Sequence, residues 1–509
     1  MGFSTVLSAC LHGIEVKMVH IEADISNGLP MFHMVGYLAA EVKEASERVK
    51  TALRNSNMPL PAKKIVVNFA PANMRKRGAT FDLPVAVALL SSFESIEVNH
   101  LGKTLFLGEL SLDGSIREVT GVLPIVREAK KQDCQACVIP SENEAEGRLV
   151  DGIEIVGVSH LLEVYDYLKG KYKGSKQKIL TSRKMETKLD FADVKGQEIM
   201  KRATEVAVAG NHNILFIGPP GSSKSLLAQR VPSISPLLTK KEMIEVSNIY
   251  SIKGLLDKNN PLMSTRPFRS VHHTVTRAAL VGGGKVPSIG ELSLANNGCL
   301  LLEEIAEFRR ETLEALRQPL EDKKIEITRS LGTYTFPANI MLVATMNPCP
   351  CGNYPDYHKC TCTDTQIRQY LNKISQPLLS RIDMCVEAPR VEFETLQQNE
   401  IVESSEVIRQ RVCQARDTQS ARYKRTNQTT NDELQGDDIE KYCVLDEGSK
   451  KMMKDAYEKL QLTARTYHKI LKVARTVADL EGAKEIAASH LKEAISYRVM
   501  DIKYWRNIR

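Results

Sequence analysis

One stretch, Gly218 to Ser225, constrains the fold of this chain more than any other; it reads Gly-Pro-Pro-Gly-Ser-Ser-Lys-Ser. It follows an apolar run over residues 213–217 and precedes a helix-forming run over residues 226–230. A buried strand, a glycine-rich loop, Lys-Ser and a helix form the P-loop pattern. In that pattern, backbone N–H groups and the helix N-terminus hold a chain of phosphates. The sequence therefore predicts an α/β nucleotide-binding domain.

The residues of this loop have distinct expected roles. Lys224 would reach the β- and γ-phosphates, and Ser225 would ligate Mg²⁺. Ser223 departs from the pattern, which has glycine at this position. A positive φ at Ser223 would strain the backbone by roughly 1 kcal/mol, because a Cβ is disfavoured there. The predicted nucleotide-binding residues are Gly218, Pro219, Pro220, Gly221, Ser222, Ser223, Lys224, Ser225 and Leu226.

Composition narrows the class of protein. The chain has 509 residues, enough for about three domains. No apolar run reaches the roughly 18 residues that span a bilayer, and no signal-peptide pattern is seen, so we expect a cytoplasmic protein without a membrane partner. The net charge of +7 is compatible with nucleic-acid binding without requiring it. The eleven cysteines of a chain without an export signal do not suggest a disulfide framework.

Four regions follow from the pattern of the chain. Residues 1–168 alternate strands and helices, which predicts an α+β domain with its own core. Residues 169–188 are rich in Lys, Ser and Gly and read as a basic linker. Residues 189–392 form the P-loop domain, and residues 393–509 are mostly helical. Expected elements include a strand over 16–23, helices over 39–55, 82–90 and 308–320, and a long helix over 402–425.

The first region resembles the proteolytic (S5-like) domain of Lon-type proteases. The resemblance lies in Gly108–Gly114, Gly121–Pro124 and Val138–Asn143. That family uses a Ser-Lys dyad, whose lysine would fall near Pro124 and whose serine would fall within residues 81–85; neither is present. Ser115 and Ser141 have no paired base in the expected place. We therefore expect a protease fold without protease chemistry, with a structural or DNA-guiding role.

The second region is similar to AAA+ ATPases, and specifically to the magnesium-chelatase-like YifB/ComM family. The lead-in Asp193–Gln197 resembles the adenine-side entry of AAA+ proteins, and the stretches 266–274, 280–284 and 290–295 match the YifB/ComM family. The first of these contains His272 and His273. Adjacent histidines on a strand point to opposite faces, so we prefer contacts with DNA or nucleotide to a shared metal ion.

An apolar run over 299–302 ends in Glu303 and Glu304, the place of the second nucleotide motif. The first carboxylate would help to hold Mg²⁺ and the second would polarise the attacking water. Glu303 is one methylene longer than the usual Asp. The resemblance further implies that Asn347, which ends the apolar run 340–346, is the sensor-1 amide, and that a hairpin over 324–337 presents Arg329 to DNA phosphate. Solvated glutamates and an exposed turn arginine are the alternatives.

Two Cys-x-Cys pairs, with eight residues between them, follow Asn347. Four thiolates suit a tetrahedral Zn²⁺, and such an ion would be structural. A loop of free thiols is the alternative, and we favour zinc. The predicted ligands are Cys349, Cys351, Cys360 and Cys362.

The resemblance also implies two arginines that act on the nucleotide. Arg381 would reach the γ-phosphate of a neighbouring subunit, which requires a ring, usually of six subunits. A salt bridge to Asp383 is the alternative. Arg465, at the start of a helix with Thr463 as its N-cap, would be sensor 2, with Arg475 as the competing candidate.

The sequence thus predicts an AAA+ module with a helical lid behind a Lon-protease-like domain. The implied function is an ATP-dependent hexameric ring motor on single-stranded or branched DNA, a helicase or branch-migration factor in recombination of incoming DNA. A remodeller of a protein partner and a nucleotide-binding scaffold with little hydrolysis stay open. Because Ser223 and Glu303 both depart from the usual motifs, we predict ATP binding with reduced turnover.

Overall fold

The fold divides into two compact units. A computed structural model describes residues 2–93, 101–172, 189–284, 286–329, 332–391, 394, 402–424, 426 and 428–506. The N-terminal unit comprises Met1–Lys184 and Lys240–Ser264, and the P-loop unit comprises Met185–Thr239 and Thr265–Arg509. Residues 173–188, most of the predicted basic linker, lie outside the described residues. In the described part of the chain, no helix is both long and apolar enough to cross a membrane.

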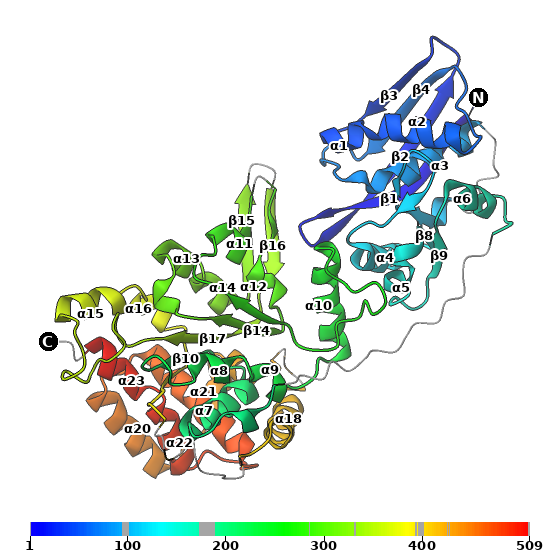
Figure 1. The fold of residues 1–509 in the computed structure, drawn as a ribbon. Coiled ribbons are helices and arrows are strands. Elements are labelled where there is room, and N and C mark those ends of the chain that lie inside the picture. Colours follow the sequence, from blue (N-terminus) through cyan, green and yellow to red (C-terminus); the bar gives the residue numbers. More distant parts are fainter. Residues whose placement is uncertain are drawn as a thin grey trace. The chain divides into compact units, whose positions relative to one another are not determined.

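A seven-stranded mixed sheet forms the N-terminal unit, in the order β3-β4-β2-β1-β5-β8-β9 (Figure 1). Its strands are β1 (Gly2–His12), β2 (Glu15–Ser26), β3 (Met31–Val35), β4 (Lys64–Ala70), β5 (Thr104–Phe106), β8 (Ala136–Pro140) and β9 (Glu154–Val158). β1 and β2 form a long antiparallel pair, whereas β1, β5, β8 and β9 run parallel. The sequence analysis anticipated β2 but missed β1, which forms the longest pairing of this sheet.

The helices of the N-terminal unit are α1 (Ala40–Lys43), α2 (Ala45–Asn55), α3 (Asp82–Phe93), α4 (Val122–Lys131), α5 (Glu144–Gly147), α6 (Leu161–Leu168) and α10 (Lys240–Ile252). The single helix expected over 39–55 is two helices, with Glu44 between them. α3 is buried along nearly its whole length, which explains why its sequence is apolar on every side. It packs against β1 and β2 and belongs to the core of this unit.

The place of the Lon-type serine is occupied by a buried ion pair. Asp82 is fully buried at the start of α3, and the Arg48 guanidinium donates to both of its carboxylate oxygens at 2.7 and 2.9 Å. The backbone N–H of Leu110 donates to the same carboxylate at 3.3 Å. Burial raises the pKa of Asp82, although Arg48 opposes this effect. The arrangement therefore stabilises the fold and offers no nucleophile.

Residues 240–264 interrupt the P-loop unit in sequence but belong to the N-terminal unit. α10 packs against α4. The backbone N–H of Gly121 donates to the carbonyl of Ser251 at 3.0 Å, and the Ser251 hydroxyl donates to the buried Glu146. The sequence-based division assigned this segment to residues 189–392, whereas its contacts join it to the N-terminal unit.

The P-loop unit is built on a five-stranded sheet in the order β11-β14-β17-β10-β18, in which each strand runs parallel to its neighbours. Its strands are β10 (Ile214–Ile217), β11 (Phe268–Val271), β14 (Gly298–Leu302), β17 (Ile340–Met346) and β18 (Met384–Glu387). β10, β14 and β17 are buried at every position, as expected for parallel strands covered on both faces. The short strands β12 (Gly282–Gly283) and β13 (Ser288–Ile289) pair with each other and lie outside this sheet.

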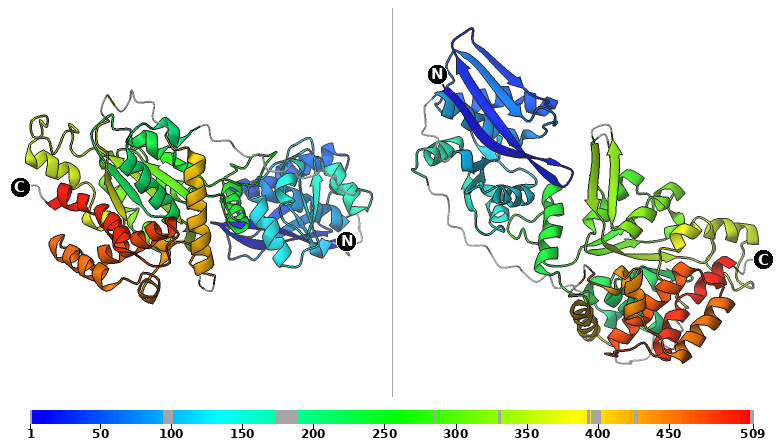
Figure 2. Two further views of the ribbon diagram at one scale, coloured as in Figure 1. Left: turned by 90° about the horizontal axis from the view of Figure 1, so that it is seen from below. Right: turned by 180° about the vertical axis from the view of Figure 1, so that it is seen from behind.

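Helices cover this sheet and extend into a helical lid. The helices around the sheet are α7 (Glu198–Gly210), α8 (Lys224–Ala228), α9 (Val231–Ile234), α11 (Arg277–Val281), α12 (Glu291–Leu294), α13 (Arg310–Glu314), α14 (Arg317–Asp322), α15 (Asp364–Leu371) and α16 (Gln376–Leu379). The lid contains α18 (Ser405–Arg422), α19 (Asp437–Tyr442), α20 (Glu447–Lys459), α21 (Ala464–Leu480), α22 (Ala488–Ser496) and α23 (Val499–Asp501). α18 and α21 pack against each other and against α7. The lid helices are coloured gold to red in Figure 2.

Of two elements expected after β14, one is broken into two helices and the other is present as expected. The helix expected over 308–320 is broken into α13 and α14. The expected hairpin is present: β15 (Lys324–Arg329) pairs with β16 (Gly332–Pro337), and Arg329 lies opposite Gly332. It extends away from the sheet of this unit (Figure 1). Ser330 and Leu331 of its turn lie outside the described residues.

Candidate nucleotide-binding site

The order of the parallel strands brings the predicted nucleotide residues to one edge of the sheet. β10 lies between β17 and β18, and β17 lies between β10 and β14 (Figure 1). The carboxyl ends of these neighbouring strands lead into Lys224, Asn347 and the Glu303–Glu304 pair. Ligands of open parallel sheets bind at this edge.

The phosphate loop itself is tightly packed. Gly218 lies against the end of β18, where a Cβ would come within 2.8 Å of the Ala388 Cβ and closer still to the Ala388 carbonyl oxygen. Ser223, directly before α8, has φ of 62°. The positive φ anticipated from the sequence is therefore present, and it strains the loop by about 1 kcal/mol relative to glycine.

Lys224 joins the loop to the predicted sensor residue. Its ammonium donates to the carbonyls of Gly218 and Pro219, both at 2.7 Å, and to Asn347 Oδ1 at 3.3 Å. Only 9% of Lys224 is exposed. Burial lowers its pKa to about 8, and the nearby Glu304 carboxylate partly offsets this effect.

The two glutamates after β14 take different positions. Glu304 has a left-handed backbone with φ of 53°, and its N–H donates to Thr345 Oγ1 of β17 at 3.2 Å. Its side chain is exposed. Glu303 is half-buried and accepts a long, 3.4 Å hydrogen bond from Gln229 just after α8. The structure thus places one carboxylate beside α8 and the other near Lys224.

The predicted finger and sensor-2 arginines converge on one carboxylate. Glu321 of α14 accepts from Arg381 and, at 2.6 Å, from Arg465. Arg465 also donates to Ser380 Oγ at 3.3 Å. Thr463 caps α21 as expected, since its hydroxyl accepts from the Thr466 N–H. Among the described residues, neither arginine side chain has a hydrogen bond to the phosphate loop.

Asp383 and Arg475, the residues named in the two alternatives, both have other partners. Asp383, proposed as an ion-pair partner of Arg381, instead accepts from Lys469 and from the Asn213 N–H, both at 2.7 Å. Arg475, the competing sensor-2 candidate, is 2% exposed and donates to Asp479 at 3.1 Å and to the carbonyls of Ala483 and Lys484. The Arg475 guanidinium is therefore buried and hydrogen-bonded inside the lid.

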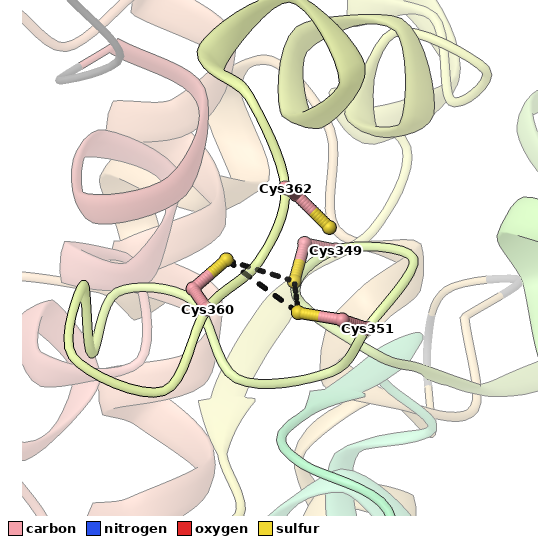
Figure 3. Close-up of side chains that lie close together, drawn as sticks. All are labelled: Cys349, Cys351, Cys360 and Cys362. Carbon is pink, nitrogen blue, oxygen red and sulfur yellow. Dashed lines mark hydrogen bonds between the residues drawn. The ribbon is translucent and has the colours of Figure 1, made fainter.

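Four thiols meet just beyond β17, and we call them the four-cysteine cluster: Cys349, Cys351, Cys360 and Cys362 (Figure 3). All four Sγ atoms lie within 4.8 Å of one another, and none is in a disulfide. Three of the Sγ–Sγ distances are 3.4, 3.5 and 3.8 Å. Zn–S bonds of about 2.3 Å in a tetrahedron place sulfur atoms about 3.8 Å apart, so the cluster fits Zn²⁺.

Known proteins match this chain along nearly its full length. Residues 190–396 match the family "Magnesium chelatase, subunit ChlI", residues 21–143 match "Subunit ChlI of Mg-chelatase", and residues 402–498 match "Magnesium chelatase, subunit ChlI C-terminal". Competence protein ComM of Haemophilus influenzae is 40% identical over 508 residues, covering 98% of each chain. Uncharacterized protein YifB of Salmonella typhimurium is 40% identical over 502 residues, with the same coverage. The chain belongs to the ComM/YifB family.

A second similarity concerns only part of this ComM/YifB-family chain. Lon protease 2 of Bacillus subtilis is 31% identical over 125 residues, which is 24% of this chain and 22% of the relative. The expected fold class is confirmed: an α/β AAA+ module of the magnesium-chelatase type accompanies a Lon-protease-like N-terminal region. AAA+ proteins of this type generally bind and hydrolyse ATP.

Some residues at the site of this ComM/YifB-family chain were missed by the sequence analysis. The Gln197 amide donates to the carbonyls of Pro389, at 2.6 Å, and of Ser222, at 3.3 Å, and so ties the lead-in to the phosphate loop. Gln197 ends the lead-in Asp193–Gln197, so this motif could have identified it. The sequence around Glu321 gives no comparable signal. The two histidines follow β11 and do not lie on it, and their rings are 4.0 Å apart, so the opposite-faces argument was wrong.

The affinity for ATP is expected to fall about tenfold between pH 7 and pH 9. A bound phosphate favours the ammonium form of Lys224, whose pKa is about 8 in this site, so above that pH binding requires proton uptake. Calorimetric titration in buffers of different ionisation enthalpy measures both the affinity and the proton uptake. Lys224→Ala should bind weakly at every pH, and a pH-independent affinity of the unaltered chain would contradict the assignment.

Proposed function

We propose that this chain is an ATP-dependent ring motor that acts on DNA, as a helicase or branch-migration factor in recombination of incoming DNA. The observation that carries the proposal is the convergence of Lys224, Asn347 and Glu304 at the edge of the parallel sheet. The Haemophilus influenzae relative is named a competence protein, which supports a role in handling incoming DNA.

In this proposal, each nucleotide lies at the phosphate loop of one subunit. Lys224 and the loop N–H groups hold the phosphates, and Ser225 and Glu303 hold Mg²⁺, which neutralises charge on the phosphates. Glu304 accepts a proton from the attacking water, which Asn347 orients. Arg381 comes from a neighbouring subunit and stabilises the charge that develops on the γ-phosphate, and Arg465 is the sensor-2 arginine of the lid. The proposed assembly is a homohexamer.

Exposed arginines of the P-loop unit support contact with a phosphate backbone. Arg329, at the end of β15, is exposed, and its guanidinium donates to the backbone carbonyls of Gly284 and Thr328. A cavity of about 810 Å³ is lined by Arg277, Arg309 and Arg310, together with Glu311, Glu314 and Ala315. Arg277 and Arg309 have no side-chain hydrogen bond or ion pair with any described residue, whereas Arg310 interacts electrostatically with Glu314. Such contacts would make DNA binding salt-sensitive and largely independent of sequence.

The rate of ATP hydrolysis with and without DNA tests the proposal. Forked or four-way DNA should stimulate hydrolysis, and the stimulation should decline as salt is raised. Strand displacement or branch migration of labelled DNA then measures the motor activity directly. Hydrolysis that DNA leaves unchanged would favour a remodeller of a protein partner, and binding of ATP without hydrolysis would favour a scaffold.

Replacing both unusual residues, in the variant Ser223→Gly with Glu303→Asp, is expected to raise the rate of hydrolysis by about tenfold. Glycine removes the strain at φ of 62°, and Asp restores the shorter metal-side carboxylate. Asn57→Gly, which changes another residue with positive φ outside the P-loop unit, should leave the rate unaltered. Steady-state phosphate release measures the effect; an unchanged rate in the double variant means that these two residues do not limit turnover.

We also propose that the four-cysteine cluster holds one structural Zn²⁺. Its sulfur atoms already have nearly tetrahedral spacing, and four thiolates leave no open coordination position for catalysis. Metal analysis of the purified chain tests this directly. Loss of the metal on replacement of Cys360 and Cys362 by Ser would identify the ligands.

A further inference from the structure

We propose that the metal bound by the four-cysteine cluster braces the phosphate loop, so that the affinity for ATP depends on metal occupancy. This inference rests on two parts of the proposed function: nucleotide binding at the loop and Zn²⁺ at the cluster. The ion would then position the phosphate loop, through the approach of Gly352 to Pro220, as well as stabilise the cysteine loop that binds it.

Gly352 places the cluster directly against the phosphate loop. It follows the ligand Cys351, has φ of 81°, and donates its N–H to the carbonyl of the ligand Cys349 at 3.0 Å. A Cβ at position 352 would lie 2.9 Å from Cγ of Pro220 and closer still to its Cδ. The backbone between two metal ligands therefore touches the loop that holds the phosphates, with no room for a side chain.

The same metal ligands follow the predicted sensor residue closely. β17 ends at Met346, Asn347 accepts from Lys224 at 3.3 Å, and Cys349 is fully buried two positions later. The cluster is thus linked to the nucleotide site at two points, through the short chain from Asn347 to Cys349 and through the approach of Gly352 to Pro220. A shift of the cysteine loop would displace both.

The position of this loop depends on cross-links more than on regular structure. Residues 347–363, all of them described, form no helix or strand. Within the loop, the Tyr354 N–H donates to Cys349 Sγ at 3.4 Å and Asn353 donates to Cys351 Sγ at 3.9 Å. Contacts with sulfur are weak, whereas binding of a structural Zn²⁺ contributes folding free energy directly. Removing the ion should therefore release the loop from Pro220.

Metal removal from the full-length chain is the first test. Zinc is withdrawn with a zinc-selective chelator while Mg²⁺ is kept in excess, and binding of a fluorescent ATP analogue is followed by anisotropy. We expect one zinc per chain and, after its removal, an affinity weaker by about tenfold or more that zinc restores. Zinc release is measured independently with a colorimetric indicator.

A variant that keeps every thiol is the second test. Gly352→Ala should retain its zinc but bind the ATP analogue about tenfold more weakly, because the new Cβ pushes against Pro220. Gly482→Ala is the matched control: Gly482 also has a positive φ, of 69°, but a Cβ there would meet nothing within 4 Å. This control should keep both its zinc and its affinity.

The outcomes separate this inference from the proposals on which it rests. An unchanged affinity after zinc removal, or in Gly352→Ala, overturns the bracing role while the nucleotide site stands. A chain that binds ATP and no zinc also overturns it. Failure of the zinc-loaded chain to bind any nucleotide contradicts the proposed function itself.

Discussion

Replacing Glu304 by Gln is expected to lower the rate of ATP hydrolysis by at least about a hundredfold while ATP binding persists. Glu304 directly follows Glu303 at the end of β14, and its exposed carboxylate is close enough to Lys224 to raise the pKa of that lysine. Its backbone is held by the hydrogen bond to Thr345 of the neighbouring strand, so the substitution removes the base without moving the chain. Gln keeps the shape of the side chain but does not accept a proton.

Phosphate release and binding of a fluorescent ATP analogue measure the two effects separately. Glu440→Gln is the matched control, because Glu440 is an exposed carboxylate of α19 in the same unit. A Glu304→Gln chain that hydrolyses ATP at the original rate would show that another residue activates the water. Loss of binding as well as hydrolysis would show that Glu304 holds the nucleotide.

Arg381→Ala is expected to lower hydrolysis by about a thousandfold or more, the usual contribution of an arginine supplied in trans. The Arg381 guanidinium is held in place by two groups of its own chain. The Pro377 carbonyl accepts from it at 2.8 Å, and the Glu321 carboxylate that it contacts is shared with Arg465. Two arginines on one carboxylate leave a net positive charge, which suits an anion brought by another subunit.

Mixing two inactive variants distinguishes an arginine that acts in trans from one that stabilises its own chain. Arg381→Ala and Glu304→Gln subunits each retain what the other lacks, so mixed rings should contain sites with both an intact base and an intact finger. We expect hydrolysis by the mixture to exceed the sum of the separate rates. Arg409→Ala, which removes a half-buried arginine of α18 that pairs with Glu406, is the control. A mixture with only the summed activity would contradict the trans assignment.

The chemistry of the nucleotide site could be predicted because its residues lie next to strands in sequence. Lys224, Glu304 and Asn347 each follow a run of apolar residues, and such runs are recognisable without tertiary information. Even the positive φ at Ser223 followed from the loop pattern, since glycine usually occupies that position. The predicted elements were less accurate where a helix contains a local break, as between α13 and α14.

Contacts between distant residues could not be predicted in this way. Arg381 and Asp383 are neighbours in sequence, yet Arg381 pairs with Glu321 while Asp383 pairs with Lys469. The attachment of residues 240–264 to the N-terminal unit likewise depends on packing between α10 and α4, which no local pattern announces.

The sequence by itself determined which side chains are available for phosphate binding, water activation and metal binding, because residue type and local spacing decide that chemistry. Tertiary structure alone decided how these groups are connected. The strand order places β17 beside β10 and so brings Asn347 to Lys224. The fold also sets Gly352 against Pro220, and with it the four-cysteine cluster against the phosphate loop. Such contacts depend on how distant segments pack, which local spacing does not encode.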